Sequence, residues 1–179
     1  MTLAIRFWSW FASRLSQPRV IYDREGRTPY LSRYYLTARP RMPDGSDPFT
    51  SYGNVRPGVL ERERICSVFL HRFHRGDDDL ALHNHPWRWA VSFVLAGGYR
   101  EERRTEDGGV EQRVVRPWNI NIIRDTTYHR VDLIDSECYS LFIAGPRAAS
   151  WSFWERDTGR TVPWRQFIEE LRNRVSRIP

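Results

Sequence analysis

The sequence of 179 residues contains no lysine, only two cysteines and no long apolar run, and each absence narrows what the chain can be. Two cysteines, Cys66 and Cys138, cannot build a disulfide framework, so we expect reduced, packed thiols in a reducing compartment. No window approaches the roughly twenty consecutive apolar residues of a membrane-spanning helix, and the pattern of a secretory signal is missing. We therefore predict a cytoplasmic protein without a transmembrane segment.

Because lysine is absent, the net charge of +6 comes entirely from arginine. These arginines are spread along the chain, and no helix-turn-helix, zinc-finger or ribonucleoprotein pattern accompanies them. We do not expect nucleic-acid binding, although a nucleic-acid-associated role stays open until salt-sensitive retention is measured. The 40% hydrophobic and 14% aromatic content excludes a disordered chain, so the sequence predicts one folded domain over residues 1–179.

Short runs rich in β-branched and aromatic residues occupy the middle of the chain, with turn signals such as Gly97-Gly98 between them. This close spacing favours an all-β sandwich or barrel. A barrel is preferred, because ligands that converge from distant strands need a concave interior. The predicted strands cover residues 64–73, 89–95, 99–104, 110–115, 119–123, 129–133 and 139–143.

Helices are predicted at both ends of the chain. Residues 3–15 form an amphipathic pattern that we expect to cover the core, with a membrane-surface helix or a transit peptide as alternatives because no acidic residue precedes Asp23. Near the other end, Thr161 is a candidate cap, and an apolar stripe predicts a helix over residues 163–177. Residues 39–57, rich in proline, predict a long surface loop, either an irregular connection or a lid.

Histidines supply the strongest chemical signal. His83 and His85 are two residues apart, so on an extended strand both side chains leave from the same face. Neutral imidazole is a common ligand for Zn, Fe, Cu and Ni, and His129 from another strand would complete a three-histidine site. Ordinary packed or surface histidines are the alternative. His71 and His74 are three apart, so at most one of them can face such a site.

The stretch from Gly76 to Gly97 resembles the first cupin motif, G(X)5HXH(X)3-4E(X)6G, with one additional residue after the first glycine. The glutamate of that motif falls at Ala90, so the fourth ligand is missing. The second motif, G(X)5PXG(X)2H(X)3N, is degraded. Its histidine is similar to His129, whereas its proline, second glycine and asparagine are replaced by Arg124, Thr126 and Leu133.

This resemblance covers about residues 64–145 and implies a double-stranded β-helix, the cupin or jelly-roll barrel, with a helix on either side. Within the superfamily, the chain is most similar to small bacterial and phage cupins with the core His83-Asn84-His85-Pro86-Trp87. Cupins are often dimers, so the resemblance also implies a homodimer.

Three neutral histidines without a carboxylate ligand leave the charge of a divalent ion unbalanced, which favours anionic substrates and thiolates. The resemblance to the three-histidine site of thiol dioxygenases implies a non-haem Fe(II) dioxygenase acting on a small anionic or thiol-containing molecule. Zn, Mn and Ni are the other candidate metals, and a non-catalytic cupin module that binds a ligand or a protein is the alternative function.

Tyrosine can donate a proton to bound oxygen species, and arginine can clamp a carboxylate with two hydrogen bonds. On this basis Tyr99, Arg72 and Arg100 are the candidate catalytic residues. Four other side chains, for which packing is the alternative role, are Trp87, Trp89, Tyr128 and Cys138.

Overall fold

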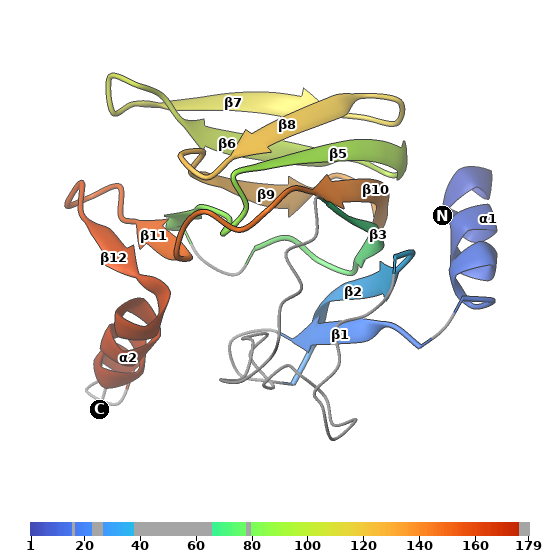
Figure 1. Ribbon diagram of the computed structural model, residues 1–179, viewed down its shortest axis with the longest axis horizontal. Helices are drawn as coiled ribbons and strands as arrows, with labels where there is room; N and C mark the ends of the chain where they lie inside the picture. Colours follow the sequence, from blue (N-terminus) through green and yellow to red (C-terminus); the bar gives the residue numbers. More distant parts are fainter. Residues whose placement is uncertain (16, 23–26, 38–65, 78–79, 176–179) are drawn as a thin grey trace.

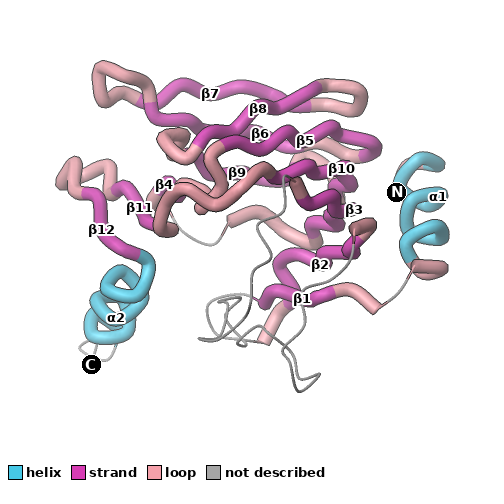
Figure 2. Tube along the Cα trace, viewed as in Figure 1, coloured by secondary structure: helices cyan, strands magenta, loops and turns pink. Residues whose placement is uncertain are grey.

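The computed structural model describes residues 1–15, 17–22, 27–37, 66–77 and 80–175. The predicted loop over residues 39–57 lies outside these ranges. Two antiparallel six-stranded sheets, packed face to face, form the body of the protein (Figure 1). Figure 2 shows the helices at opposite ends of this body.

The first sheet has the strand order β1-β2-β3-β10-β5-β8. Its strands are β1 (Arg19–Tyr22), β2 (Pro29–Tyr35), β3 (Ser67–Phe73), β10 (Cys138–Ala144), β5 (Trp89–Ala96) and β8 (Ile120–Arg124). The second sheet has the order β12-β11-β4-β9-β6-β7. Its strands are β12 (Thr161–Pro163), β11 (Ser152–Trp154), β4 (Leu82–His83), β9 (His129–Leu133), β6 (Tyr99–Arg104) and β7 (Val110–Val115).

The eight strands from β3 to β10 follow the jelly-roll order. One sheet contains β3-β10-β5-β8 and the other contains β4-β9-β6-β7, so the chain passes back and forth between the two layers. Alternating side chains explain this pairing, because β5 buries every second residue between the sheets and presents the others outward. The predicted all-β jelly roll is confirmed.

Four strands extend this core, and none of them was predicted from the sequence, nor was the short core strand β4. β1 and β2 add two strands to one sheet, and β11 and β12 add two to the other. The predicted start of the last helix is wrong, since Thr161 and Pro163 pair with Trp154 and Ser152 of β11. These residues therefore form a strand, and the helix α2 (Trp164–Val175) begins after them.

The two helices cover different parts of the sheets. α1 (Leu3–Ala12) packs on the outer face of the first sheet, where Ile5 and Ala12 meet Leu70 and Tyr139. α2 packs on the second sheet through Phe167, whose ring stacks on that of Phe153 with centroids 4.2 Å apart. The helix predicted over residues 3–15 is thus shorter, and a tight turn with hydrogen bonds from Arg14 and Leu15 follows it.

Candidate metal centre

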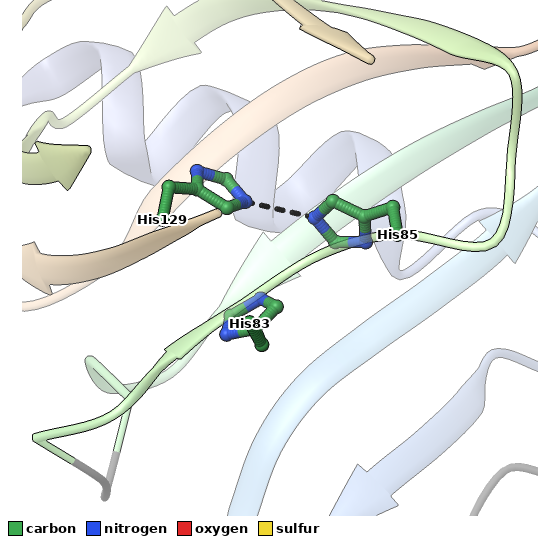
Figure 3. Close-up of side chains that lie close together, drawn as sticks. All are labelled: His83, His85 and His129. Carbon is green, nitrogen blue, oxygen red and sulfur yellow. Dashed lines mark hydrogen bonds between the residues drawn. The ribbon is translucent and has the colours of Figure 1, made fainter. Parts of the chain in front are cut away.

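Three histidines meet between the sheets, and the register of β4 and β9 explains why. His83 of β4 lies directly opposite His129 of β9, and His85 follows two residues after His83 (Figure 3). One nitrogen from each ring can be chosen so that all three lie within 4.8 Å of one another. His83 and His129 are buried and His85 is half-buried. The predicted convergence of these three side chains is therefore present in the fold.

The spacing of the ring nitrogens suits a divalent metal. Nε2 of His85 and Nε2 of His129 are 2.9 Å apart. Two nitrogens that each lie about 2.1 Å from one ion, at a right angle to each other, are about 3.0 Å apart. Because only one proton can sit between two neutral imidazoles, this contact is either a hydrogen bond or a pair of lone pairs directed at one cation. The donor set fits a divalent metal.

A buried carboxylate lies directly behind the cluster. Oε1 of Glu101 is 2.5 Å from Nδ1 of His129, and the Glu101 side chain is completely buried. Asp77 stands behind His83 in a looser way, with its Oδ2 4.0 Å from Nδ1. The expectation that a bound ion would have no carboxylate to balance it needs refinement. Ala90 indeed supplies no ligand and packs in the core, but Glu101 and Asp77 place negative charge behind the imidazoles.

Glu101 is held ionised by its neighbours. Its carboxylate accepts hydrogen bonds from Nε of Arg113 at 2.5 Å, from Nδ2 of Asn121 at 3.0 Å and from Nη2 of Arg103 at 3.2 Å. Burial opposes ionisation, but the hydrogen bond to His129 and these partners outweigh it and hold the pKa of Glu101 well below its usual range. A permanently charged acceptor therefore fixes the orientation of the His129 ring.

The other two histidines are held in the neutral form that binds metals. Burial lowers the pKa of His83 to about 4, since the nearby Asp77 opposes the loss of charge only in part. Burial and the neighbouring His129 lower the pKa of His85 well below its usual value. Both rings are therefore unprotonated at neutral pH, so a metal ion would not have to displace a proton from them.

A half-buried cation, Arg33, lies on the other side of the cluster. Nε of Arg33, on β2, donates to Nε2 of His71 at 3.0 Å, and its guanidinium lies 5.5 Å from the centroid of the Trp87 ring. Burial lowers the pKa of Arg33 to about 10, and its charge in turn depresses the pKa of His85 and His71. No carboxylate of the described residues forms an ion pair with Arg33.

The bond from Arg33 also fixes the tautomer of His71. Nε2 accepts a proton donor, so Nδ1 must carry the hydrogen of this neutral ring. Among the described residues that Nδ1 has no hydrogen-bond partner, although it is buried. A donor in this state costs free energy unless a ligand or a water accepts from it.

Aromatic rings form the apolar wall of the cluster. The ring of Trp87 stacks on that of His85 with centroids 5.7 Å apart, and Phe142 lies 6.3 Å from the same ring. On the other side, Trp151 packs edge-on against His83 at 6.2 Å. Such a wall excludes water and strengthens the charges inside it.

Of the three predicted catalytic residues, only Tyr99 lies between the sheets. Its hydroxyl accepts a hydrogen bond of 3.0 Å from Asn121, which links it to Glu101, and burial raises its pKa above the usual value. Arg72 points to the outer face of β3, where it pairs with Glu137 over the ring of Tyr139. Arg100 is exposed on the outer face of β6. Strand alternation separates both arginines from the histidines.

The remaining candidates have structural surroundings. The hydroxyl groups of Tyr128 and Ser152 lie 2.8 Å apart, and Trp89 fills the space beside Gly145. Cys138 is buried, which raises the pKa of its thiol to about 12. His74 lies 2.8 Å from the hydroxyl of Ser32, whereas His71 faces the interior, as the three-residue spacing requires.

The likeness of this chain to known proteins is confined to solved structures. No protein-family model matches it, and no curated protein matches its sequence. Among solved structures, oxalate oxidase is 18% identical over 49% of this chain and 45% of that chain, with a TM-score of 0.41. A variant of Bacillus subtilis oxalate decarboxylase is 12% identical over 76% of this chain and 29% of that chain, with a TM-score of 0.47.

A third similar structure is KdgF from Halomonas sp., which is 14% identical over 66% of this chain and 80% of that chain, with a TM-score of 0.39. The chain thus matches less than half the length of the oxidase and of the decarboxylase. These structures are similar to this chain in backbone only, so their substrates and activities are not assigned to it. No described helix is long and apolar enough to cross a membrane.

The sequence analysis did not predict two charged side chains beside the histidines, Glu101 and Arg33, although the sequence contains a signal for Glu101. Glu101 lies two residues after Tyr99 on a predicted strand, so a strand with Tyr99 inside also carries Glu101 inside. A charged residue at an inward position is unusual enough to mark a site. Arg33 gave no such signal, because β2 was not predicted and nothing in its spacing relates it to the histidines.

Proposed function

We propose that His83, His85 and His129 hold one divalent metal and that the protein is an enzyme that oxidises a small anionic or thiol-bearing molecule. The observation that carries this proposal is the meeting of three imidazoles, two of which, those of His85 and His129, have their Nε2 atoms 2.9 Å apart. Fe(II) is the favoured ion, and Zn, Mn and Ni are alternatives. When bound, Fe(II) supplies redox chemistry with O2 and Lewis acidity toward the substrate.

The carboxylate behind His129 orients this ring for metal binding. Glu101 accepts the Nδ1 proton of His129, which leaves the Nε2 lone pair of that ring directed toward His85. A charged acceptor behind a ligand ring also raises its basicity. Tyr99 belongs to this supporting network through Asn121, so we assign it a positioning role rather than contact with the substrate.

Arg33 supports an anionic substrate. Its guanidinium group is half-buried, carries a full charge at neutral pH and has no carboxylate partner in the described parts of the chain. It lies close enough to depress the pKa of His85, so a carboxylate, sulfonate or similar group bound to Arg33 would bring the rest of a small molecule to the metal. The Nδ1 proton of His71 offers a second donor to such a ligand.

Metal analysis of the purified protein tests the site. The wild-type protein is expected to hold close to one equivalent of a divalent metal, and His85→Ala is expected to lose it. His74→Ala is the matched control, because His74 lies outside the cluster beside Ser32. Retention of metal by His85→Ala, or failure of the chelated wild-type protein to take up Fe(II), Zn²⁺, Mn²⁺ or Ni²⁺, would overturn the proposed site.

Oxygen consumption tests the reaction. The Fe(II)-loaded protein is offered a panel of small carboxylates and thiols, and a substrate is expected to stimulate O2 uptake in the wild-type protein but not in His85→Ala. Arg33→Gln should raise the KM for an anionic substrate while metal content stays unchanged. If the protein binds metal but turns over no compound of the panel, the alternative function, a non-catalytic binding module, would be favoured over an enzyme.

A further inference from the structure

The first helix carries a second apolar face that no other described part of the protein covers. Leu3, Phe7 and Trp10 are 83%, 53% and 54% exposed, and Phe11 beside them is also exposed. The ring contacts of Phe7, Trp10 and Phe11 with described residues are all made within α1 itself. These side chains therefore form an outward surface, which we call the outer face of α1.

Packing on the sheet does not account for this face. Ile5 and Ala12, on the opposite side of the helix, are already fully buried against Leu70 and Tyr139, with Trp8 and Leu15 beside them. A helix of ten residues needs one apolar stripe to dock on a sheet, and α1 has that stripe without its outer face. Exposed aromatic side chains that are gathered on one surface mark a contact with something else.

The charge on this helix is of one sign. Arg6 and Arg14 are exposed, and the guanidinium carbon of Arg14 lies 5.0 Å from the centroid of the Trp10 ring. Residues 1–22 contain no aspartate or glutamate. The outer face of α1 therefore combines aromatic side chains with arginines and no acidic residue, which is the composition of helices that lie in the headgroup region of anionic membranes.

A second copy of the chain suits this face less well. In a two-fold contact the same surface stands on both sides, so Arg6 and Arg14 of each copy would meet an apolar face that carries two more arginines and no carboxylate. Anionic lipid headgroups supply the negative charge that the helix lacks, and acyl chains receive the aromatic rings.

We propose that α1 lies flat in the surface of an anionic lipid bilayer, with Leu3, Phe7, Trp10 and Phe11 toward the acyl chains and Arg6 and Arg14 at the headgroups. The opposite stripe of the helix packs on the jelly roll, so the body of the protein would be held at the membrane through α1. Figure 1 shows α1 at one end of this body. This inference is independent of the metal centre.

Sedimentation of the full-length protein with lipid vesicles tests the proposal. We expect binding to vesicles of phosphatidylcholine mixed with phosphatidylglycerol, little binding to phosphatidylcholine alone, and weaker binding as salt rises. Phe7→Ser with Trp10→Ser should reduce binding at least about tenfold, because two large apolar side chains are lost from the interface. Arg6→Gln with Arg14→Gln should remove most of the preference for the anionic lipid.

Leu80→Ser is the control, since Leu80 is 76% exposed but precedes β4 in another part of the fold. It should bind as the wild-type protein does. Because all the substituted side chains are exposed, thermal unfolding should show that each variant folds. Absence of binding to anionic vesicles, or equal binding by the Phe7 and Trp10 double variant, would overturn the proposal. A wild-type dimer that this variant converts to a monomer, without vesicle binding, would instead assign the face to a second copy.

Discussion

Glu101 is the main negative charge next to the three-histidine cluster. It is buried and ionised, it forms a hydrogen bond with His129, and it forms ion pairs with Arg103 and Arg113. Its outward neighbour Glu102 also pairs with arginine, at Arg130, but on the other face of the strand. These adjacent glutamates carry the same charge on opposite faces of the strand. Substituting each in turn therefore distinguishes an effect on the histidine cluster from a general effect on stability.

Glu101→Gln should weaken metal binding by about 10- to 100-fold, because the His129 ring loses its charged acceptor. Titration of the chelated protein with Zn²⁺ measures the affinity, and Glu102→Gln serves as the control that should leave it unchanged. Equal affinities of Glu101→Gln and the wild-type protein would mean that this carboxylate does not act on the cluster.

Trp118 has an unusual backbone conformation, with a φ of 74°. Among the described residues it is the only one other than glycine with a positive φ. A bulky side chain therefore occupies the left-handed conformation that glycine adopts freely.

Trp118→Gly should be more stable than Trp118→Ala by about 1 kcal/mol, because both variants lose the indole ring but only glycine removes the left-handed strain. Urea denaturation of the two variants measures the difference. Since both lose the same contact with Phe93, the comparison isolates the backbone. Equal stabilities would show that the turn is not strained at this position.

At the scale of elements, the strands with clear alternation were predictable and the short ones were not. β6, β7 and β9 have the predicted bounds. β6 and β9 begin with a clear alternation between buried and more exposed residues, whereas only Val115 is buried in β7. β4, β11 and β12 contain two or three residues each, which is too short for a period to be visible. β4 pairs with β9, β11 with β4 and β12 with β11, so their formation depends on the tertiary fold.

The two faces of α1 should differ sharply in their effect on stability. Ile5→Ala removes a fully buried side chain from the outer face of the first sheet and should cost about 2–4 kcal/mol of unfolding free energy. Phe7→Ala removes an exposed ring and should cost less than about 0.5 kcal/mol. Chemical denaturation of both variants measures this contrast, and a loss of similar size in the two would mean that the outer face packs on the protein.

At the scale of the whole molecule, the jelly roll brings together groups that no local pattern relates. The cluster and its charges come from β2, β3, β4, β6 and β9, which lie in two different sheets. The histidines were predictable because the two-residue spacing of His83 and His85 is typical of a metal site. Arg33 was not predictable, because its approach to His71 and the cluster depends on the register of β2 against β3.

This convergence of buried neutral histidines should make the protein sensitive to acid. Burial and the charge of Arg33 lower the pKa of His71 well below its usual value, and burial lowers the pKa of His83 to about 4. The unfolded chain binds protons at these positions near pH 6.5, so between that pH and the folded pKa it holds more protons than the folded protein does. Stability is therefore complete above about pH 7 and is lost as the pH falls toward 5.

Urea denaturation in the presence of a chelator measures this loss between about pH 7.5 and about pH 5.5, a window above the range in which Glu101 titrates. Each buried histidine contributes a slope of up to about 1.4 kcal/mol per pH unit, and His71→Gln should remove one such contribution. Saturating Zn²⁺ should raise the stability at both pH values without reducing this slope, since the folded His83 and His85 rings hold no proton for the metal to displace and the unfolded chain still binds protons at these positions. A chelated protein equally stable at both pH values would mean that these rings are protonated in the fold, and the proposed metal centre would lose its unprotonated ligands.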